Sequence, residues 1–341
     1  MKLAIISTTI HGEKGYLRYD HIAKSSKFSS VGFYIAGDKK SPPFNTSAFS
    51  CEIKYLTPEM QKCYASSDAI GWNKSARRNI ALLEAIKDNP DFILTIDDDN
   101  IPSDDYFDLL YKVATSPVQK IVTSIKKLPH THWHNYLSKT DSIFEIYARG
   151  FPIPFRYKNS TVVTKSPKKI LANKIGVFQG ISLGDPDIDA QTRIVYPKPT
   201  PLNIVREKNY VLKNIWSPYN SQNTMLSRKL FPLAFMWPNA GRSEDIYASY
   251  VWQRFLFNNN MYAHIGDPVN RQVRGKRDDL RDLALEAESY LKGHEIWAEI
   301  NKIREKDALS FIKELMKSSH EMIARERNFM SAFLEDLKKV L

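Results

Sequence analysis

The sequence of 341 residues contains 43% hydrophobic and 12% aromatic residues, a composition that is typical of globular proteins and excludes a largely disordered chain. Its two cysteines, Cys51 and Cys63, have no metal-binding spacing and give no reason to expect a disulfide, so we expect a reducing, cytoplasmic setting. The net charge is +11, and residues 151–215 contain 11 Lys and Arg against 4 Asp and Glu. An acidic partner would explain this excess, and solvated surface lysines would explain it equally well.

The N-terminal part of the chain shows an alternation of strands and helices. Residues 2–9 are a short, β-branched apolar run without a small-residue cleavage site, which predicts a first strand rather than a signal peptide. Residues 31–38 form a second apolar run, and residues 75–88 have apolar side chains at helical spacing. No window approaches the roughly 18 apolar residues of a membrane-spanning helix, so we expect a soluble protein.

Three aspartates follow the next predicted strand. Residues 91–96 are short and apolar, and they lead directly into Asp97, Asp98 and Asp99. A helix is then predicted over residues 103–115. Ligands of open parallel sheets bind at the carboxyl ends of the strands, so these carboxylates lie where the phosphates of a nucleotide would bind. The order of these elements predicts an α/β fold.

The rest of the chain divides into an irregular and a helical part. Residues 116–262 mix short strands, prolines and loops, and their topology cannot be assigned from the sequence. Residues 278–341 are charged and periodic, with no proline and with Gly293 as their only glycine, which predicts two or three helices. We therefore predict a catalytic domain over residues 1–277 and a helical C-terminal appendage over residues 278–341.

The aspartate triplet has a chemical requirement of its own. Three consecutive carboxylates repel one another unless a cation or basic groups neutralise them. Mg²⁺ or Mn²⁺ fits this need, because both prefer oxygen ligands and can bridge a protein carboxylate to a diphosphate. We therefore predict that Asp97, Asp98 and Asp99 bind one of these ions. The alternative is a structural turn in which Asp99 or Asn100 caps the helix after Pro102.

Six short segments, spread in order over residues 1 to about 285, carry a resemblance to known proteins. They are residues 75–80 (SARRNI), 93–100 (ILTIDDDN), 149–156 (RGFPIPFR), 184–190 (GDPDIDA), 217–224 (SPYNSQNT) and 242–247 (RSEDIY). Together they resemble the plant reversibly glycosylated polypeptides, which are UDP-arabinopyranose mutases, and the related STELLO proteins. The resemblance implies a GT-A fold, an α/β nucleotide-diphosphate-sugar transferase fold with a mixed central sheet. This agrees with the α/β prediction above.

The resemblance also implies roles for four arginines. Arg149 corresponds to the arginine that is reversibly glycosylated in the mutases, and Arg156 corresponds to the second arginine that they need. An arginine stays protonated and is a poor nucleophile, whereas its planar fork suits a diphosphate, so we favour phosphate or sugar binding for both. A structural salt bridge is the alternative. Arg77 and Arg78, in the first segment, are assigned to substrate binding, and Arg149 is also kept as a catalytic candidate.

Four acidic residues outside the triplet are further candidates. Asp187 and Asp189 would point the same way on an extended segment and could contact sugar hydroxyls, although their sequence is also typical of a turn. Glu244 and Asp245 precede an aromatic-rich helix, and a carboxylate there could act as general base on an attacking hydroxyl. The alternative is that both acids stabilise the helix N-terminus.

The remaining candidates are amides and a histidine. Asn220, Gln222 and Asn223 could hydrogen-bond the substrate, although loop amides are commonly structural. The mutases have a histidine in the segment that corresponds to residues 266–271, and this chain has none there. His264 is a nearby substitute as a third metal ligand, and the alternative is a structural histidine in a strand.

A histidine-rich segment, residues 130–134, lacks an acid or cysteine at familiar zinc spacing, so we expect a loop, on the acceptor side. Within it, Trp133 could stack on a sugar or a base, or simply pack in the core.

These observations predict a metal-dependent glycosyltransferase. It would move a sugar, arabinose-like by the resemblance, from a UDP-sugar to an acceptor hydroxyl, with Mn²⁺ or Mg²⁺ at the aspartates. A polyanionic acceptor such as DNA or an acidic glycan would account for part of the positive charge. The alternatives are a mutase that interconverts pyranose and furanose forms of a UDP-sugar, and a non-catalytic scaffold of glycosylation enzymes. The missing histidine and the positive charge favour transfer, because a mutase needs no macromolecular acceptor surface.

Overall fold

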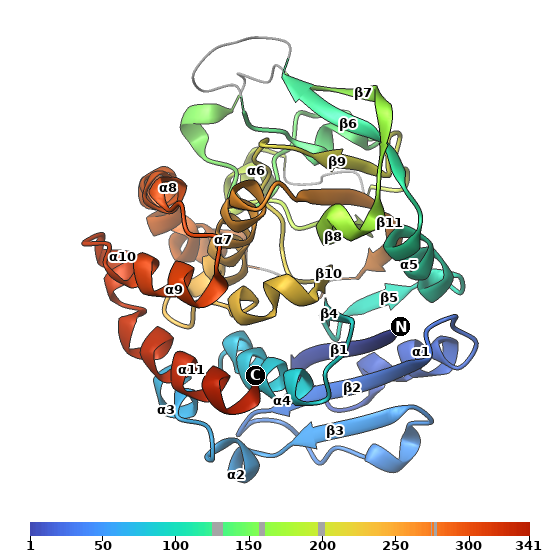
Figure 1. Cartoon of the computed structure of the whole chain (residues 1–341), viewed down its shortest axis with the longest axis vertical. Helices are drawn as coiled ribbons and strands as arrows, with labels where there is room; N and C mark the ends of the chain where they lie inside the picture. The colour runs from blue at the N-terminus through green and yellow to red at the C-terminus, as the bar shows by residue number, and fades with distance from the viewer. Residues whose placement is uncertain (125–131, 157–160, 197–201, 274, 276–277) are drawn as a thin grey trace.

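The chain folds around a mixed β-sheet that has helices on both faces (Figure 1). The computed structural model describes residues 1–341 except 125–131, 157–160, 197–201, 274 and 276–277. Within the described residues the strand order is β3-β2-β1-β4-β10-β8-β11-β9-β6-β7, and β5 pairs with the end of β11. The strands are β1 (Lys2–Thr9), β2 (Ser30–Gly37), β3 (Glu52–Leu56), β4 (Phe92–Ile96), β5 (Asn100–Pro102), β6 (Val118–Ser124), β7 (Thr161–Ile170), β8 (Ile175–Gly184), β9 (Tyr210–Leu212), β10 (Asn223–Ser227) and β11 (Tyr262–Gln272).

The first half of the sheet is parallel. β1 pairs in parallel with β2 and β4, and β2 pairs in parallel with β3. The strands predicted at residues 2–9, 31–38 and 91–96 are therefore confirmed as β1, β2 and β4, with ends that differ by one residue at most. Their alternating side chains face opposite sides of the sheet: Leu3 and Ile5 lie in one buried cluster, and Ala4 and Ile6 in the other.

The second half of the sheet is mixed. β10 is antiparallel to both β4 and β8, so β8 runs in the same direction as β4, and β11 is parallel to β8. The carboxyl ends of β1, β2, β4, β8 and β11 therefore lie at one edge, where β10 begins. This edge collects segments that are far apart in the sequence. The arrangement confirms the predicted α/β class with a mixed central sheet.

Helices form a layer on each face of the sheet. α1 and α5 share a buried cluster with one face, and α4, α7 and the C-terminal helices share a cluster with the other. None of the helices in the described part of the chain is long and apolar enough to cross a membrane. The α-helices are α1 (Lys14–Ala23), α2 (Pro58–Gln61), α3 (Ser66–Ile70), α4 (Arg78–Lys87), α5 (Tyr106–Thr115), α6 (Ala190–Val195), α7 (Glu244–Asn258), α8 (Asp279–Lys302), α9 (Ala308–Met316), α10 (Glu321–Ala324) and α11 (Arg327–Val340). Short 3₁₀ helices are η1 (Thr46–Ala48), η2 (Ser75–Arg77), η3 (Tyr136–Lys139), η4 (Ile153–Phe155), η5 (Ala172–Lys174), η6 (Arg228–Leu233) and η7 (Gly241–Ser243).

The C-terminal segment is helical, with four helices where two or three were predicted, and these pack onto the sheet domain. Residues 278–341 form α8, α9, α10 and α11, and α11 lies beside α3 and α4 (Figure 1). The buried carboxylate of Asp336 on α11 accepts hydrogen bonds from the backbone amides of Ala65 and Ser66, at 2.9 and 2.8 Å. One hydrophobic cluster includes residues of both predicted units. The proposed boundary at residue 277 adjoins residues outside the described part of the chain.

Candidate active site

A cavity of about 360 Å³ lies at the carboxyl edge of the sheet, beside the aspartate triplet. Asp97, Asp98 and Asp99 follow β4 directly in a tight turn. α5 begins only at Tyr106, with Asp105 at its N-cap position, so neither Asp99 nor Asn100 caps this helix. The lining residues come from the ends of β1, β2 and β4 and the start of α4: Thr8, Thr9, Ile10, His11, Asp38, Lys40, Asn73, Lys74, Ser75, Arg78, Asp97, Asp98 and Asp99.

Each aspartate of the triplet is held by a different partner. Arg78 forms an ion pair with Oδ1 of Asp97. The hydroxyl of Thr9 donates to Oδ2 of Asp98 at 2.6 Å, and the amide of Gln272 donates to Asp99 at 3.2 Å. The three carboxylates therefore point toward three separate neighbours, from α4, β1 and β11.

Gly15 on α1 allows the helix to approach this turn closely. A Cβ atom at Gly15 would lie 2.2 Å from the backbone oxygen of Asp98, which is closer than atoms can approach. Any larger side chain would push α1 and the turn apart. The position of Asp98 therefore depends on a glycine that the sequence alone does not single out.

A second cavity, of about 230 Å³, adjoins the first. Ser75, Arg78 and Asp97 line both cavities, so the two form adjacent parts of one cleft. The second cavity is also lined by the start of α7 and the segment after β8. Its further lining residues are Arg149, Asp187, Ser221, Gln222, Gly241, Arg242, Glu244 and Asp245.

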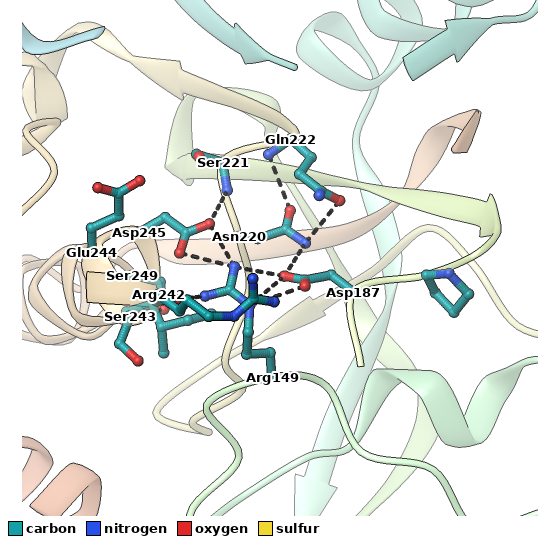
Figure 2. Close-up of polar contacts among 12 residues, drawn as sticks. Arg149, Asp187, Asn220, Ser221, Gln222, Arg242, Ser243, Glu244, Asp245 and Ser249 are labelled. Atoms are coloured by element: carbon teal, nitrogen blue, oxygen red, sulfur yellow. Dashed lines mark hydrogen bonds and ion pairs between the residues drawn. The ribbon is translucent and has the colours of Figure 1, made fainter. Parts of the chain in front are cut away.

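Arg149 is the centre of a buried polar network in this second cavity (Figure 2). Its Nη2 lies 2.8 Å from Asp187 and 3.1 Å from Asp245, its Nε also donates to Asp187 at 3.0 Å, and its Nη1 donates to the backbone oxygen of Arg242. Burial lowers the pKa of Arg149, but the charges of Asp187 and Asp245 outweigh this effect and hold the pKa well above its ordinary value. The guanidinium is therefore a permanent cation whose three nitrogens are all occupied.

Glu244 is a carboxylate of the cleft whose pKa lies near neutrality. It begins α7 and lines the cleft, and the hydroxyl of Ser75 donates a hydrogen bond to it. Burial of the carboxylate, and then the charge of Asp245, raise the pKa of Glu244 to about 7. A carboxylate with this pKa can accept a proton from a hydroxyl near neutral pH.

The predicted amides divide between the cleft and the core. Asn220 donates to Asp187 at 3.1 Å and so supports the network, and Gln222 lines the second cavity. Asn223 is the first residue of β10, and its side chain bonds the hydroxyl of Tyr106 and the backbone oxygen of Pro268. The structure therefore brings Gln222 to the cleft and places the side chain of Asn223 in the packing of the sheet.

Two predicted arginines and one aspartate lie in buried structural networks. Arg77 donates to Gln61 and to the backbone oxygen of Ser67, and it does not line either cavity. Arg156 forms a buried ion pair with Asp189, and Asp189 also caps α6. Asp187 and Asp189, which were expected to point the same way, contact different arginines because the chain enters α6 directly after them.

His264 is not brought to the aspartates. It lies within β11, where it pairs with residues of both β8 and β9, eight residues before Gln272, which contacts Asp99. Burial lowers the pKa of His264 to about 4, so the ring is neutral. Gln272, not His264, occupies the position beside the triplet.

Other lining residues were not predicted as site residues. Asp38, directly after β2, is buried, and its carboxylate accepts a hydrogen bond from the backbone amide of Asn73 at 2.7 Å. Thr8 and Thr9 end β1. The signal that could have identified them is their position at the carboxyl ends of predicted parallel strands, where ligands bind.

Only residues 132–134 of the histidine-rich segment, which was predicted as an acceptor-side loop, belong to the described part of the chain. Residues 130 and 131 lie outside the described residues. His134 is buried, with its ring nitrogens 3.0 Å from the hydroxyls of Thr161 and Tyr210, and Trp133 packs among other aromatic rings away from the cleft.

Comparison with known proteins gives limited similarity. No protein-family model and no curated protein matches the chain. Among solved structures, S. aureus TarS residues 1–349 in complex with UDP-GlcNAc has a TM-score of 0.44 and 11% sequence identity, covering 98% of this chain and 72% of that one. A second structure of S. aureus TarS residues 1–349 has a TM-score of 0.36 and 10% identity, covering 100% of this chain and 90% of that one. Scores of this size do not transfer residue roles, and the resemblance to the reversibly glycosylated polypeptides and STELLO proteins stays a prediction.

Proposed function

We propose that this protein is a metal-dependent glycosyltransferase that moves a sugar from a nucleoside diphosphate sugar to an acceptor hydroxyl. One observation carries the proposal: two adjoining cavities share Asp97, Arg78 and Ser75. The first has the aspartate triplet at the carboxyl ends of parallel strands, where nucleotides bind in α/β sheets. The second is lined by Glu244, a carboxylate with a pKa of about 7 that accepts a hydrogen bond from Ser75.

The donor set at the triplet fits Mg²⁺ or Mn²⁺. Among the described residues no group of three or more His, Cys, Asp and Glu is placed to hold a metal ion. A cation that binds through one or two carboxylates together with phosphate oxygens and water needs no such group. Asp97 and Asp98 each use one carboxylate oxygen in the contacts to Arg78 and Thr9, which leaves the other oxygen for such a role. When bound, the ion would neutralise the diphosphate and the charge that develops on it as the sugar departs.

The residues of the second cavity would carry out the transfer step. The carboxylate of Glu244 takes the proton from the acceptor hydroxyl, whose oxygen then forms a bond to the anomeric carbon of the sugar. The bond between that carbon and the diphosphate breaks, and its electron pair leaves with the nucleotide. Gln222, which lines the same cavity, would bind a sugar hydroxyl, whereas Asp187 is taken up by Arg149 and Asn220.

The protonation and hydrogen bonds of Arg149 favour a transferase over a mutase that is glycosylated on this arginine. A nucleophilic guanidinium must lose a proton, and two carboxylates raise the pKa of Arg149 well above its ordinary value. Its three nitrogens also donate to Asp187, Asp245 and the backbone of Arg242. We therefore assign Arg149 a positioning role in which it holds the two carboxylates on the cleft wall.

The finer parts of the proposal concern the donor and the acceptor. A UDP-sugar with an arabinose-like sugar follows from the family resemblance alone. A polyanionic acceptor follows from the positive charge, part of which is carried by the exposed Lys165, Lys168, Lys169 and Lys174 on and after β7. β7 lies six strands from β4 in the sheet, about 29 Å at the usual strand spacing. An extended polymer would be suited to contact the lysines of β7 and the cleft together.

The test is incubation of the protein with a panel of UDP-sugars and Mn²⁺, with and without DNA and acidic glycans, while UDP and sugar isomers are followed. Acceptor-dependent release of UDP is the expected result. Conversion between pyranose and furanose forms without release of UDP would show a mutase instead. No turnover and no binding of any nucleotide sugar would favour the scaffold.

A further inference from the structure

A cavity of about 430 Å³ lies outside the cleft, between α7, α8 and two loops. Its aromatic lining consists of Trp133, Trp216, Phe257 and Trp297. The whole sequence contains six tryptophans, so half of them gather here. The volume is within the range of small-molecule sites, which runs from about 300 to 1,000 Å³.

The aromatic rings form an ordered wall. Trp133 and Trp216 are stacked, with centroids 6.1 Å apart and an angle of 25° between the planes. Trp297 lies 5.8 Å from Trp133 and 5.9 Å from Trp216, and Phe257 packs edge-on against Trp216 at 4.9 Å. Trp133 and Trp216 are almost fully buried, whereas Trp297 and Phe257 are only partly buried. The last two therefore offer aromatic surface to a ligand, and the first two hold them in place.

Polar groups stand beside this aromatic wall. Arg254 is fixed by a hydrogen bond to the backbone oxygen of Ile303 at 2.8 Å and by one to Asn301 at 3.2 Å. Burial, and then the charge of Arg304, lower the pKa of Arg254 to about 10, so it stays charged at neutral pH. The exposed Asn214 also lines the cavity. A ligand can thus meet one rigid cation, two amides and the imidazole of the exposed His132.

We propose that this cavity is a second saccharide-binding site, separate from the cleft, in which a sugar ring lies against Trp297 and Phe257 and its hydroxyls bond to Arg254 and Asn214. An amphipathic ring suits the mixture of aromatic faces and a few fixed polar groups. A nucleic acid fits less well, because it requires several phosphate contacts, and Arg254 is the one Lys or Arg that lines the cavity among the described residues. No acidic side chain of the described residues lines it either, so uronic acids are not repelled.

The aromatic cavity and the cleft are connected by α7, which lines both of them. α7 contributes Asp245 to the cleft and Arg254 to this cavity, nine residues later and about 14 Å along the helix axis. If the proposed function holds, the second site binds a distal part of a glycan acceptor. Its capacity to bind sugar does not depend on catalysis, so the two proposals can fail separately.

The experiment is a screen of the full chain against immobilised neutral and uronic-acid-containing oligosaccharides, followed by titration of the best oligosaccharide with tryptophan fluorescence as the signal. We expect binding that is independent of UDP and Mn²⁺. Trp297→Ala should weaken it about tenfold, as loss of an aromatic anchor does. Asn214→Gly is the second variant: Asn214 has φ of 53°, which glycine adopts freely, so the side chain is removed without backbone strain, and binding should fall several-fold.

Controls separate this site from the cleft and from loss of folding. Leu291→Ala, at an exposed position of α8, and Asp98→Asn, in the cleft, should both bind the oligosaccharide as the native protein does. The thermal midpoint of each variant shows whether it is folded. The proposal is overturned if no oligosaccharide binds, if both cavity variants bind like the native protein, or if a single-stranded oligo-dT displaces the sugar from the cavity. Transfer activity without saccharide binding would overturn this proposal alone, and saccharide binding without transfer would leave it standing.

Discussion

The two halves of the cleft use their carboxylates in opposite ways. Asp97, at the end of β4, is 30% exposed and meets a single arginine, whereas Asp187 and Asp245 are 3% and 9% exposed and share the guanidinium of Arg149. A buried carboxylate with a full set of partners stabilises structure, and one with a spare oxygen at a cleft surface is suited to a ligand. The comparison shows that proximity to the cleft alone does not identify a reactive acid.

The largest expected effect comes from removing Arg149, the cation of the buried network in the second cavity. Arg149→Met would leave Asp187 and Asp245 buried without their cation, and removal of one partner from a buried charged network costs about 3–5 kcal/mol. We expect a loss of this size in the free energy of unfolding, measured with urea. Arg18→Met is a matched control, since its ion pair with Asp104 is exposed and should contribute less than about 1 kcal/mol. Equal losses of stability in both variants would show that the buried network of Arg149 contributes no more than an exposed ion pair.

Glu244 also lines the second cavity, and burial raises its pKa to about 7. As general base it must be ionised, so the turnover rate should rise with pH up to about 7 and then level off. Glu244→Gln should reduce the rate by about 10²- to 10⁴-fold and abolish this rise, as measured by pH–rate profiles. A variant that keeps the native rate and profile would exclude Glu244 as the base.

The same carboxylate predicts a change of stability with pH. Since the folded pKa of Glu244 lies above the ordinary value of 4.5, its protonated form contributes stability that is present below pH 4.5 and is lost as the pH rises through about 7. Glu244→Gln lacks this loss, so it should become more stable relative to the native protein as the pH rises from 5 to 8. Urea unfolding at several pH values measures the difference, and a difference that does not change with pH would contradict the raised pKa.

The smallest effect should come from Ser75. Its hydroxyl hydrogen bond lowers the pKa of Glu244 and so opposes the effect of burial. Ser75→Ala should therefore move the rising limb of the pH–rate profile to higher pH and reduce the rate at pH 7 by a few-fold. Full activity at high pH would distinguish this shift from a loss of structure. An unchanged limb would mean that Ser75 does not act on Glu244.

The sequence predicted those features that depend on local patterns. β1, β2 and β4 have clear apolar runs, and the aspartates follow β4 directly, so the position of the triplet at the sheet edge could be predicted. The topology of the middle of the chain could not, because it depends on β10 pairing antiparallel between β4 and β8, which are far apart in sequence.

The roles of single side chains were harder to predict than the elements. Arg77 and Arg78 are adjacent, and successive residues on a helix point about 100° apart, so only Arg78 reaches Asp97 while Arg77 binds Gln61. His264 and Gln272 lie on one strand, and only strand pairing decides which of them is beside Asp99. These choices depend on tertiary contacts that no spacing in the sequence encodes.

In the proposed function, Asp98 takes part in metal-dependent binding of a nucleoside diphosphate. Calorimetric titration with UDP, in Mn²⁺ and in EDTA, tests it on the native protein, on Asp98→Asn and on Asp104→Asn, whose side chain is 90% exposed. We predict that Mn²⁺ tightens UDP binding at least about tenfold in the native protein and in Asp104→Asn, and that Asp98→Asn loses this gain while remaining folded. The same Mn²⁺-dependent gain in all three proteins would show that Asp98 does not take part in metal-dependent binding.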